Sequence, residues 1–142
     1  MMLQEIQVNK SKRMVYAMDE DYNVIAQYPC STAYYAGYNE YGEPYGNAPE
    51  GVYDDENVWA EAKGQYADEP PYGWGYLNLD NRGRAIHGGG SNLDDPYEPY
   101  QNLTPTYGCY RMHNADIFHL CLMFIDAQEK GSKPVVTVVG GE

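Results

Sequence analysis

One cysteine of this chain stands where its thiol could act as a nucleophile. Cys109 follows Gly108 in the stretch PTYGCYRMHNADIFHL, directly ahead of a segment with helical character. Backbone amides and the positive end of a helix dipole stabilise a thiolate, and Arg111 adds a positive charge two residues further on. The amide of Gly108 could also face a developing oxyanion. This placement predicts a reactive sulfur at the entrance of a helix.

A cysteine nucleophile needs a base, and the chain offers three histidines, His87, His113 and His119. His119 falls inside the helical segment, where we expect a partly buried or surface position and no part in catalysis. His113 suits a helix cap. His87 is the candidate base, because RAIHGGGS ends an apolar strand segment in three glycines. We expect these glycines to present the imidazole at a strand edge with unobstructed approach for a substrate. A histidine in a hairpin turn is an equal interpretation of this stretch.

The other two cysteines, Cys30 and Cys121, are expected to be buried. Three cysteines at wide spacing match neither a disulfide framework nor a zinc site built from Cys-x-x-Cys pairs. Cys121 also shares an apolar helical stripe with Ile117, Leu120 and Phe124. We therefore expect no metal and no cofactor, and at least one free thiol.

Alternating residues and turn signals predict a mainly β chain. Residues 4 to 30 read as an antiparallel meander, with NKSK and DEDYN as turns and an alternating set made of Ile6, Val8, Met14, Tyr16, Met18, Val24, Ala26 and Tyr28. The stretch between residues 31 and 59 is dense in Tyr, Gly, Pro and acidic residues, which favours turns and exposed loops. Further short strands are expected around 52–53, 74–79 and 84–87, and the run KPVVTVVGG predicts a buried last strand.

The helix predicted after Cys109 has signals at both ends. Asn114, or His113 before it, can cap the start, and Asp116 lies in the first turn, where the helix dipole favours a negative charge. Gly131 is well placed just past the end.

The bulk properties exclude several classes of partner. The 142 residues suit one domain, 1–142, with one hydrophobic core. Nine Lys and Arg against 21 Asp and Glu give a net charge of -12, which disfavours nucleic acid. No stretch approaches the roughly 20 apolar residues that cross a bilayer, and MMLQEIQVNKSKR lacks the apolar region of a signal peptide.

Taken together, AIHGGG and the later TYGCYRMHNADIFHL resemble the YkuD-type L,D-transpeptidase catalytic domain of bacterial cell-wall enzymes. The family signature is His-Gly, a gap in the mid-teens, then Ser/Thr-His-Gly-Cys-x-Arg/Asn. Here the matching pieces are His87-Gly88 and the segment from Thr106 to Arg111. GNAPEGVY and GSKPVVTVV are similar to further parts of the family. The resemblance implies a mainly β sandwich or barrel of mixed sheets, with one main helix after the cysteine.

The resemblance also implies roles for individual residues. Cys109 would be the nucleophile and His87 the general base, with the Gly88 carbonyl orienting the imidazole. The amides of Gly108 and Cys109 would form the oxyanion hole, and Arg111 would brace the loop or meet a substrate carboxylate. The thiolate would attack the third residue of a peptidoglycan stem tetrapeptide, release D-alanine and form a thioester. An amine acceptor would then give a cross-link, and water would give carboxypeptidase activity.

One residue departs from the family pattern. Tyr107 replaces the usual histidine before Gly-Cys, so a bulkier phenol that does not titrate near neutrality would line the acyl site. Two alternatives therefore stay open beside the enzyme, a catalytically silent relative that binds cell-wall peptide or glycan through tyrosine-rich loops, and a cysteine hydrolase or antibacterial effector. The substrate implies a location in the cell envelope, periplasmic or extracellular. The family resemblance implies that a carbapenem would acylate the cysteine. The oligomeric state is left open.

Overall fold

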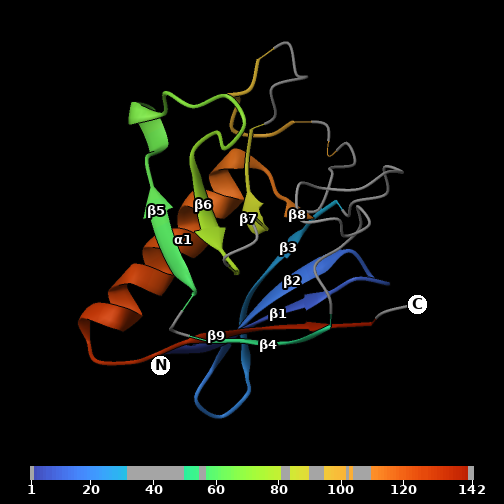
Figure 1. Ribbon diagram of the computed structural model, residues 1–142, viewed down its shortest axis with the longest axis vertical. Helices are drawn as coiled ribbons and strands as arrows, with labels where there is room; N and C mark the ends of the chain where they lie inside the picture. Colours follow the sequence, from blue (N-terminus) through green and yellow to red (C-terminus); the bar gives the residue numbers. More distant parts are fainter. Residues whose placement is uncertain are drawn as a thin grey trace.

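The described part of the chain folds into two mixed β-sheets with a long helix packed against them (Figure 1). This computed structural model describes residues 2–31, 50–54, 57–80, 84–89, 95–101, 103 and 110–140. The predicted Tyr-rich loop falls largely on residues 32–49, which lie outside the described residues. So do residues 104–109, with three of the predicted site residues.

The first sheet contains the predicted meander. Its strand order is β3-β2-β1-β9-β4, and the strands are β1 (Leu3–Asn9), β2 (Met14–Asp19), β3 (Val24–Pro29), β4 (Gly51–Tyr53) and β9 (Val135–Val139). The β1–β2 and β2–β3 pairs are antiparallel, as predicted. The last strand, β9, lies between β1, to which it is parallel, and β4, to which it is antiparallel.

The buried face of β2 differs from the alternating set that predicted the strand. Val15 and Ala17 are buried, and they pair in register with the buried Val8 and Ile6 of β1, whereas Met14 and Tyr16 are half-buried. The segment MVYAM is apolar at every position, so alternation alone cannot select a face. Pairing with β1 selects it instead.

The second sheet positions the candidate base. Its order is β5-β6-β7-β8, and the strands are β5 (Trp59–Ala62), β6 (Gly75–Asn78), β7 (Ala85–His87) and β8 (Tyr110–Arg111). The β5–β6 and β6–β7 pairs are antiparallel, and β7–β8 is parallel. A 3₁₀ helix, η1 (Gly64–Tyr66), follows β5. Since β7 lies between β6 and β8, the expectation of a strand edge for His87 is wrong.

Helix α1 (Asn114–Glu129) lies behind β5 and β6 in Figure 1, and its buried side chains belong to one core cluster with those of both sheets. The predicted stripe is confirmed, because Ile117, Leu120, Cys121 and Phe124 are all fully buried. The helix contacts β5, β6 and β7 of the second sheet and β1 of the first. It therefore joins the sheet that carries His87 to the meander.

The predicted end of the helix is confirmed. Gly131 has a φ of 91°, its amide donates to the Gln128 carbonyl at 3.0 Å, and the Ser132 amide donates to the Ala127 carbonyl at 2.9 Å. These two bonds form a Schellman motif, which satisfies carbonyls at the helix end.

The helix begins where predicted, at Asn114 with His113 in the N-cap position, but it does not follow Cys109 directly. Four residues, Tyr110 to His113, separate Cys109 from the first helical residue, and the first two form strand β8. The chain after Cys109 therefore enters a strand, because Tyr110 is buried and pairs with Ile86 of β7. The expectation that the cysteine stands directly at a helix entrance is wrong.

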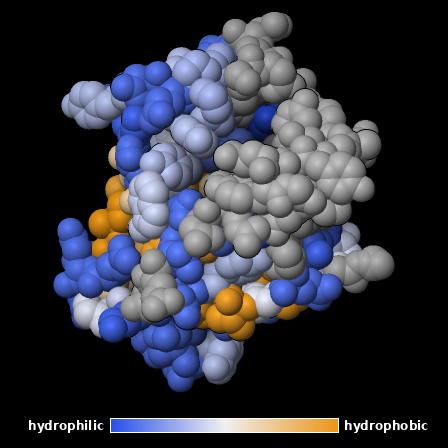
Figure 2. Space-filling view, in the orientation of Figure 1, coloured by the Kyte–Doolittle hydropathy of each residue, from blue (hydrophilic) through white to orange (hydrophobic). Residues whose placement is uncertain are grey.

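The surface seen in Figure 2 is mainly hydrophilic where the residues are described, with hydrophobic residues in small separate groups. Exposed apolar side chains come from different elements, for example Val24 of β3, Val52 of β4 and Leu122 of α1. Among the described helices, none has the length and apolar character needed to span a bilayer.

Candidate active site

His87 ends strand β7 inside the second sheet. It pairs with Tyr76 of β6 on one side and with Arg111 of β8 on the other, and its carbonyl accepts the Met112 amide at 2.8 Å. The preceding Ile86 is fully buried, which holds the strand in the core, and His87 itself is only 6% exposed. Its backbone is therefore fixed by neighbouring strands on both sides.

The imidazole of His87 is held by the next residue in the chain. Its Nδ1 atom lies 2.6 Å from the Gly88 carbonyl oxygen. A carbonyl can only accept, so Nδ1 carries the proton and donates it. In the neutral ring this leaves Nε2 with a free lone pair, as a general base requires. The Tyr72 ring packs edge-on against the imidazole at a centroid distance of 5.8 Å.

The surroundings of His87 keep the imidazole neutral. Burial lowers its pKa from 6.5 to about 4; the Gly88 hydrogen bond opposes this shift, and the positive charge of Arg111 adds to it. The ring is therefore unprotonated at neutral pH and able to accept a proton.

The glycines after His87 are packed rather than open. A Cβ on Gly88 would lie 2.3 Å from Asn114 Oδ1, and one on Gly89 would lie 2.4 Å from the amide nitrogen of Gly73. Gly89 has a φ of 62°, a region that favours glycine. At these two positions the expectation of unobstructed approach is wrong, because side chains are excluded by close neighbours. Gly90 lies outside the described residues.

The predicted site residues are only partly within the described ranges. His87, Gly88 and Arg111 are described, and the structure brings them together through the β7–β8 pairing and the turn after β7. Arg111 is 6% exposed. Tyr107, Gly108 and Cys109 lie outside the described residues.

The other two histidines have structural contacts. His113 stands at the N-cap position without a capping side-chain bond among the described residues, and its Nδ1 accepts the Gln101 amide at 3.0 Å. His119 is exposed, as the sequence allowed, and its Nδ1 hydrogen-bonds the Tyr28 hydroxyl. Neither histidine contacts His87 through any of these bonds.

Cys30 and Cys121 are buried, as predicted. Burial raises the pKa of the Cys30 thiol to about 12 and raises that of Cys121 as well. The Cys121 thiol donates to the Tyr76 carbonyl at 3.4 Å. Both sulfurs are therefore protonated at neutral pH and occupy the core.

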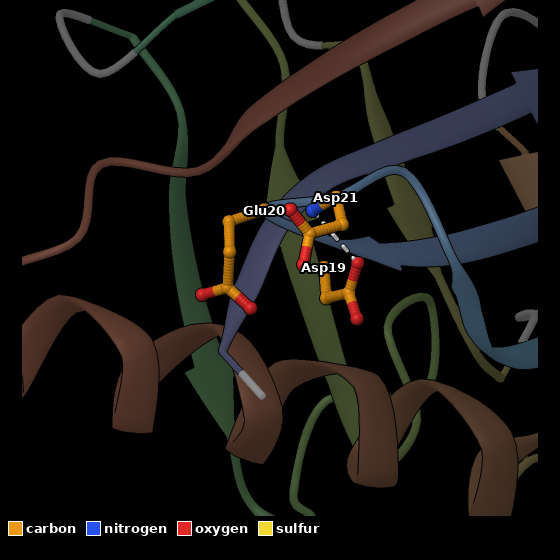
Figure 3. Close-up of side chains that lie close together, drawn as sticks. All are labelled: Asp19, Glu20 and Asp21. Carbon is orange, nitrogen blue, oxygen red and sulfur yellow. Dashed lines mark hydrogen bonds between the residues drawn. The ribbon is translucent and has the colours of Figure 1, made fainter.

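One group of side chains in the described residues has the spacing of metal ligands. Asp19, Glu20 and Asp21 lie together at the turn between β2 and β3 (Figure 3). Asp19 is 4% exposed and accepts the amides of Asn23 and Asp21, each at 2.9 Å. These bonds, that of Asn23 foremost, lower the pKa of Asp19. The buried carboxylate thus has a structural use, which is to close the hairpin turn.

A cavity of about 490 Å³ lies beside η1. Its lining comes from the segment 62–66, Trp74, and the Phe118 and Leu122 side chains of α1. The lining is mainly aromatic and aliphatic, and Lys63 within it is paired with Asp68 at 2.7 Å and Glu69 at 2.8 Å. Of the predicted site residues that the structure describes, His87, Gly88 and Arg111, none lines this cavity.

The contacts of Asn114 in the structure differ from the role that the sequence predicted for it. Asn114, predicted as a possible cap, is fully buried and hydrogen-bonds the Trp74 and Gly89 amides at 3.1 and 3.0 Å. Its partners lie 40 and 25 residues earlier in the chain. A cap explains an asparagine at a helix start equally well, so nothing in the sequence pointed to these contacts.

Comparison with known proteins places this architecture in a family. The family model for YkuD, the L,D-transpeptidase catalytic domain, matches residues 4–123. An L,D-transpeptidase structure from Xylanimonas cellulosilytica DSM 15894 is similar, with a TM-score of 0.57, 18% identity, and coverage of 97% of this chain and 61% of that chain. Bd1075 from Bdellovibrio bacteriovorus is also similar, with a TM-score of 0.58, 15% identity, and coverage of 98% and 48%. No curated protein matches the sequence. The match over residues 4–123 shows that the chain belongs to the YkuD family of L,D-transpeptidase catalytic domains.

Proposed function

We propose that this protein is a peptidoglycan L,D-transpeptidase, or an L,D-carboxypeptidase, with Cys109 as nucleophile and His87 as general base. The observation that carries the proposal is the state of His87. Its ring is neutral, its Nδ1 is engaged by the Gly88 carbonyl, and its Nε2 is left to accept a proton.

The peptide bond between Cys109 and strand β8 supports a Cys109–His87 pair. Cys109 is bonded to Tyr110, the first residue of β8, and β8 lies beside β7. Consecutive Cα atoms are about 3.8 Å apart, and paired strands lie about 4.8 Å apart. The structure thus holds Tyr110, the residue bonded to Cys109, beside the strand that carries His87.

The proposed reaction has two halves. His87 Nε2 takes the Cys109 proton, and the sulfur attacks the carbonyl carbon of the third residue of a stem tetrapeptide. The amides of Gly108 and Cys109 bind the oxyanion. The C–N bond to D-alanine breaks, the leaving nitrogen receives the proton from His87, and a thioester remains. An amine or water then attacks this thioester, His87 takes its proton, and the sulfur leaves as a thiol after reprotonation.

Two further residues complete the proposed site. Arg111, mostly covered and next to His87 in the parallel pair, would brace the β8 segment or meet a substrate carboxylate. Tyr107 would line the acyl site with its phenol. The substrate would place the protein in the cell envelope, on the periplasmic or extracellular side.

The experiment is incubation of purified protein with a disaccharide tetrapeptide from peptidoglycan, followed by mass spectrometry of the products. We expect loss of D-alanine, with a cross-linked dimer for a transpeptidase or a tripeptide for a carboxypeptidase. Cys109→Ala should abolish both products. A Cys30→Ala variant is the matched control, since that thiol is buried, and it should keep the activity if it folds. Binding of the muropeptide without turnover would instead assign the protein to the silent, cell-wall-binding alternative.

A further inference from the structure

Asn114 connects three separate segments around the candidate base. Its side chain is fully buried at the first position of α1. Oδ1 accepts the Gly89 amide at 3.0 Å and the Trp74 amide at 3.1 Å. Nδ2 donates to the Pro96 carbonyl at 2.8 Å and the Glu98 carbonyl at 2.5 Å. Both acceptor sites and both donor protons of the carboxamide are therefore used.

The segments held by Asn114 are the ones that surround the turn after His87. Gly88 donates to the Tyr72 carbonyl at 3.1 Å, so the turn is also fastened to the chain before Trp74. A Cβ on Gly73 would lie 2.1 Å from Asn114 Oδ1, and one on Gly88 would lie 2.3 Å from the same atom. The carboxamide thus fills the space between the two glycine turns, and neither turn can shift toward it.

The third segment, residues 95–101, is held over the same turn. Gln101 Nε2 donates to the Gly89 carbonyl at 2.7 Å, and Trp74 Nε1 donates to the Tyr97 carbonyl at 2.9 Å. Gly89 is therefore bound on its amide by Asn114 and on its carbonyl by Gln101. Gly88, whose carbonyl accepts the hydrogen bond from His87 Nδ1, therefore lies between His87 and Gly89, and the backbone of each is held by hydrogen bonds.

We propose that Asn114 is a positioning residue for His87, because its carboxamide fixes the Gly88–Gly89 turn and thereby the carbonyl that sets the tautomer and orientation of the imidazole. The inference rests on the proposed function in treating His87 as the base. Asn114 itself touches neither His87 nor substrate in this account. Its removal should therefore act on the catalytic rate constant and not on substrate binding.

Two variants test the inference, with one matched control. Asn114→Asp is isosteric and keeps an acceptor for Gly89, but when ionised it has no donor for the Pro96 and Glu98 carbonyls. Asn114→Ser replaces the whole carboxamide with a shorter hydroxyl. The control is Asn78→Asp in β6, because Asn78 Nδ2 also donates to two carbonyls, those of Asn57 at 2.7 Å and Asp80 at 3.0 Å. Asn78 pairs with Ala85, at the other end of β7 from the glycine turn.

The first readout is independent of activity. Nitrogen-15 NMR of the histidine rings reports which nitrogen of neutral His87 carries the proton. We expect a single Nδ1-protonated tautomer in the wild type and in Asn78→Asp, and a mixture of tautomers in the Asn114 variants. An Asn114 variant that folds and keeps the wild-type tautomer overturns the inference.

The second readout is turnover of the muropeptide. Misplacement of a catalytic group by about 1 Å can cost about 100-fold in rate, so kcat should fall about 100-fold in the Asn114 variants while KM stays within about twofold. A raised KM with unchanged kcat, or an equal loss in Asn78→Asp, contradicts a positioning role.

The outcomes separate the two proposals. A wild type without turnover, but with a tautomer that depends on Asn114, refutes the proposed function and leaves this inference standing. Normal turnover with a His87 tautomer that does not depend on Asn114 refutes this inference and leaves the proposed function standing. Should neither Asn114 variant fold while Asn78→Asp folds, Asn114 serves folding alone, and the positioning role is overturned.

Discussion

The Nδ1 atom of His87 lies 2.6 Å from the carbonyl oxygen of Gly88, and both residues are held among buried neighbours. This contact gives the imidazole one defined tautomer and leaves its Nε2 as the only ring nitrogen with a free lone pair. We expect this hydrogen bond and the burial around it to determine how His87 titrates and accepts a proton.

The first prediction concerns the titration of His87. Burial lowers its pKa to about 4, with the Gly88 hydrogen bond opposing the shift. NMR titration of the Cys109→Ala variant, in which no thiol charge can interfere, should therefore show His87 protonating at about pH 4. In the active protein the acid limb of kcat/KM should lie well below pH 6.5. A midpoint at or above 6.5 would show that the ring is solvated.

The second prediction links the same pKa to stability. The unfolded imidazole, with a pKa of 6.5, binds a proton before the folded one, whose pKa is about 4. Acid therefore favours the unfolded state in this window, and the stability due to neutral His87 is lost as pH falls from 6.5 toward 4. The loss should reach about 3 kcal/mol relative to a His87→Gln variant.

Urea unfolding at several pH values measures this difference. His119→Gln, at an exposed histidine, is the control for removing an imidazole. Parallel pH profiles for the wild type and His87→Gln would refute the linkage.

The third prediction concerns the cysteines. Burial raises the pKa of Cys30 to about 12 and raises that of Cys121, so neither supplies thiolate at pH 8. Iodoacetamide should modify Cys109 alone in the folded, reduced protein, and all three thiols in urea. Peptide mapping identifies the modified residue. Modification of Cys30 or Cys121 in the folded protein at the rate of Cys109 would contradict their placement in the core.

The fourth prediction concerns the end of α1. Gly131 has a φ of 91°, and a Cβ there would meet no atom within 4 Å, so a side chain costs backbone strain without a clash. Gly131→Ala should lower the free energy of unfolding by about 1 kcal/mol. Gly131→Asn should cost less, because asparagine tolerates this conformation better. Chemical denaturation of the two variants provides the comparison, and equal stability of all three proteins would exclude a strained C-terminal cap.

The sequence predicted the elements whose signals are local. The meander, α1 with its buried stripe and Gly131, and the last strand follow from residue period and end signals within each segment. Strands β5 and β8 were not predicted. The segment WAEA of β5 has weak strand propensity, and β8 has two residues whose extended form depends on pairing with Ile86 and His87 of β7.

The site was predictable to a smaller extent, because its geometry depends on distant contacts. His87 could be singled out by its glycines, and the family resemblance assigned a role to the Gly88 carbonyl. The burial that lowers the pKa of His87 arises from β6, β8 and Tyr72. No pattern in the sequence around His87 predicts that these distant residues pack against it. The position of Asn114 among Trp74, Gly89 and the segment 95–101 is likewise a product of tertiary packing.

In the proposed mechanism, the sulfur of Cys109, activated by His87, forms a covalent acyl bond. Intact-protein mass spectrometry after incubation with a carbapenem detects such a bond. We expect an added mass of one carbapenem on the folded, reduced wild type, a much slower addition to His87→Gln, and none to Cys109→Ala. An unmodified wild type, or an adduct that persists in Cys109→Ala, would show that Cys109 is not the nucleophile.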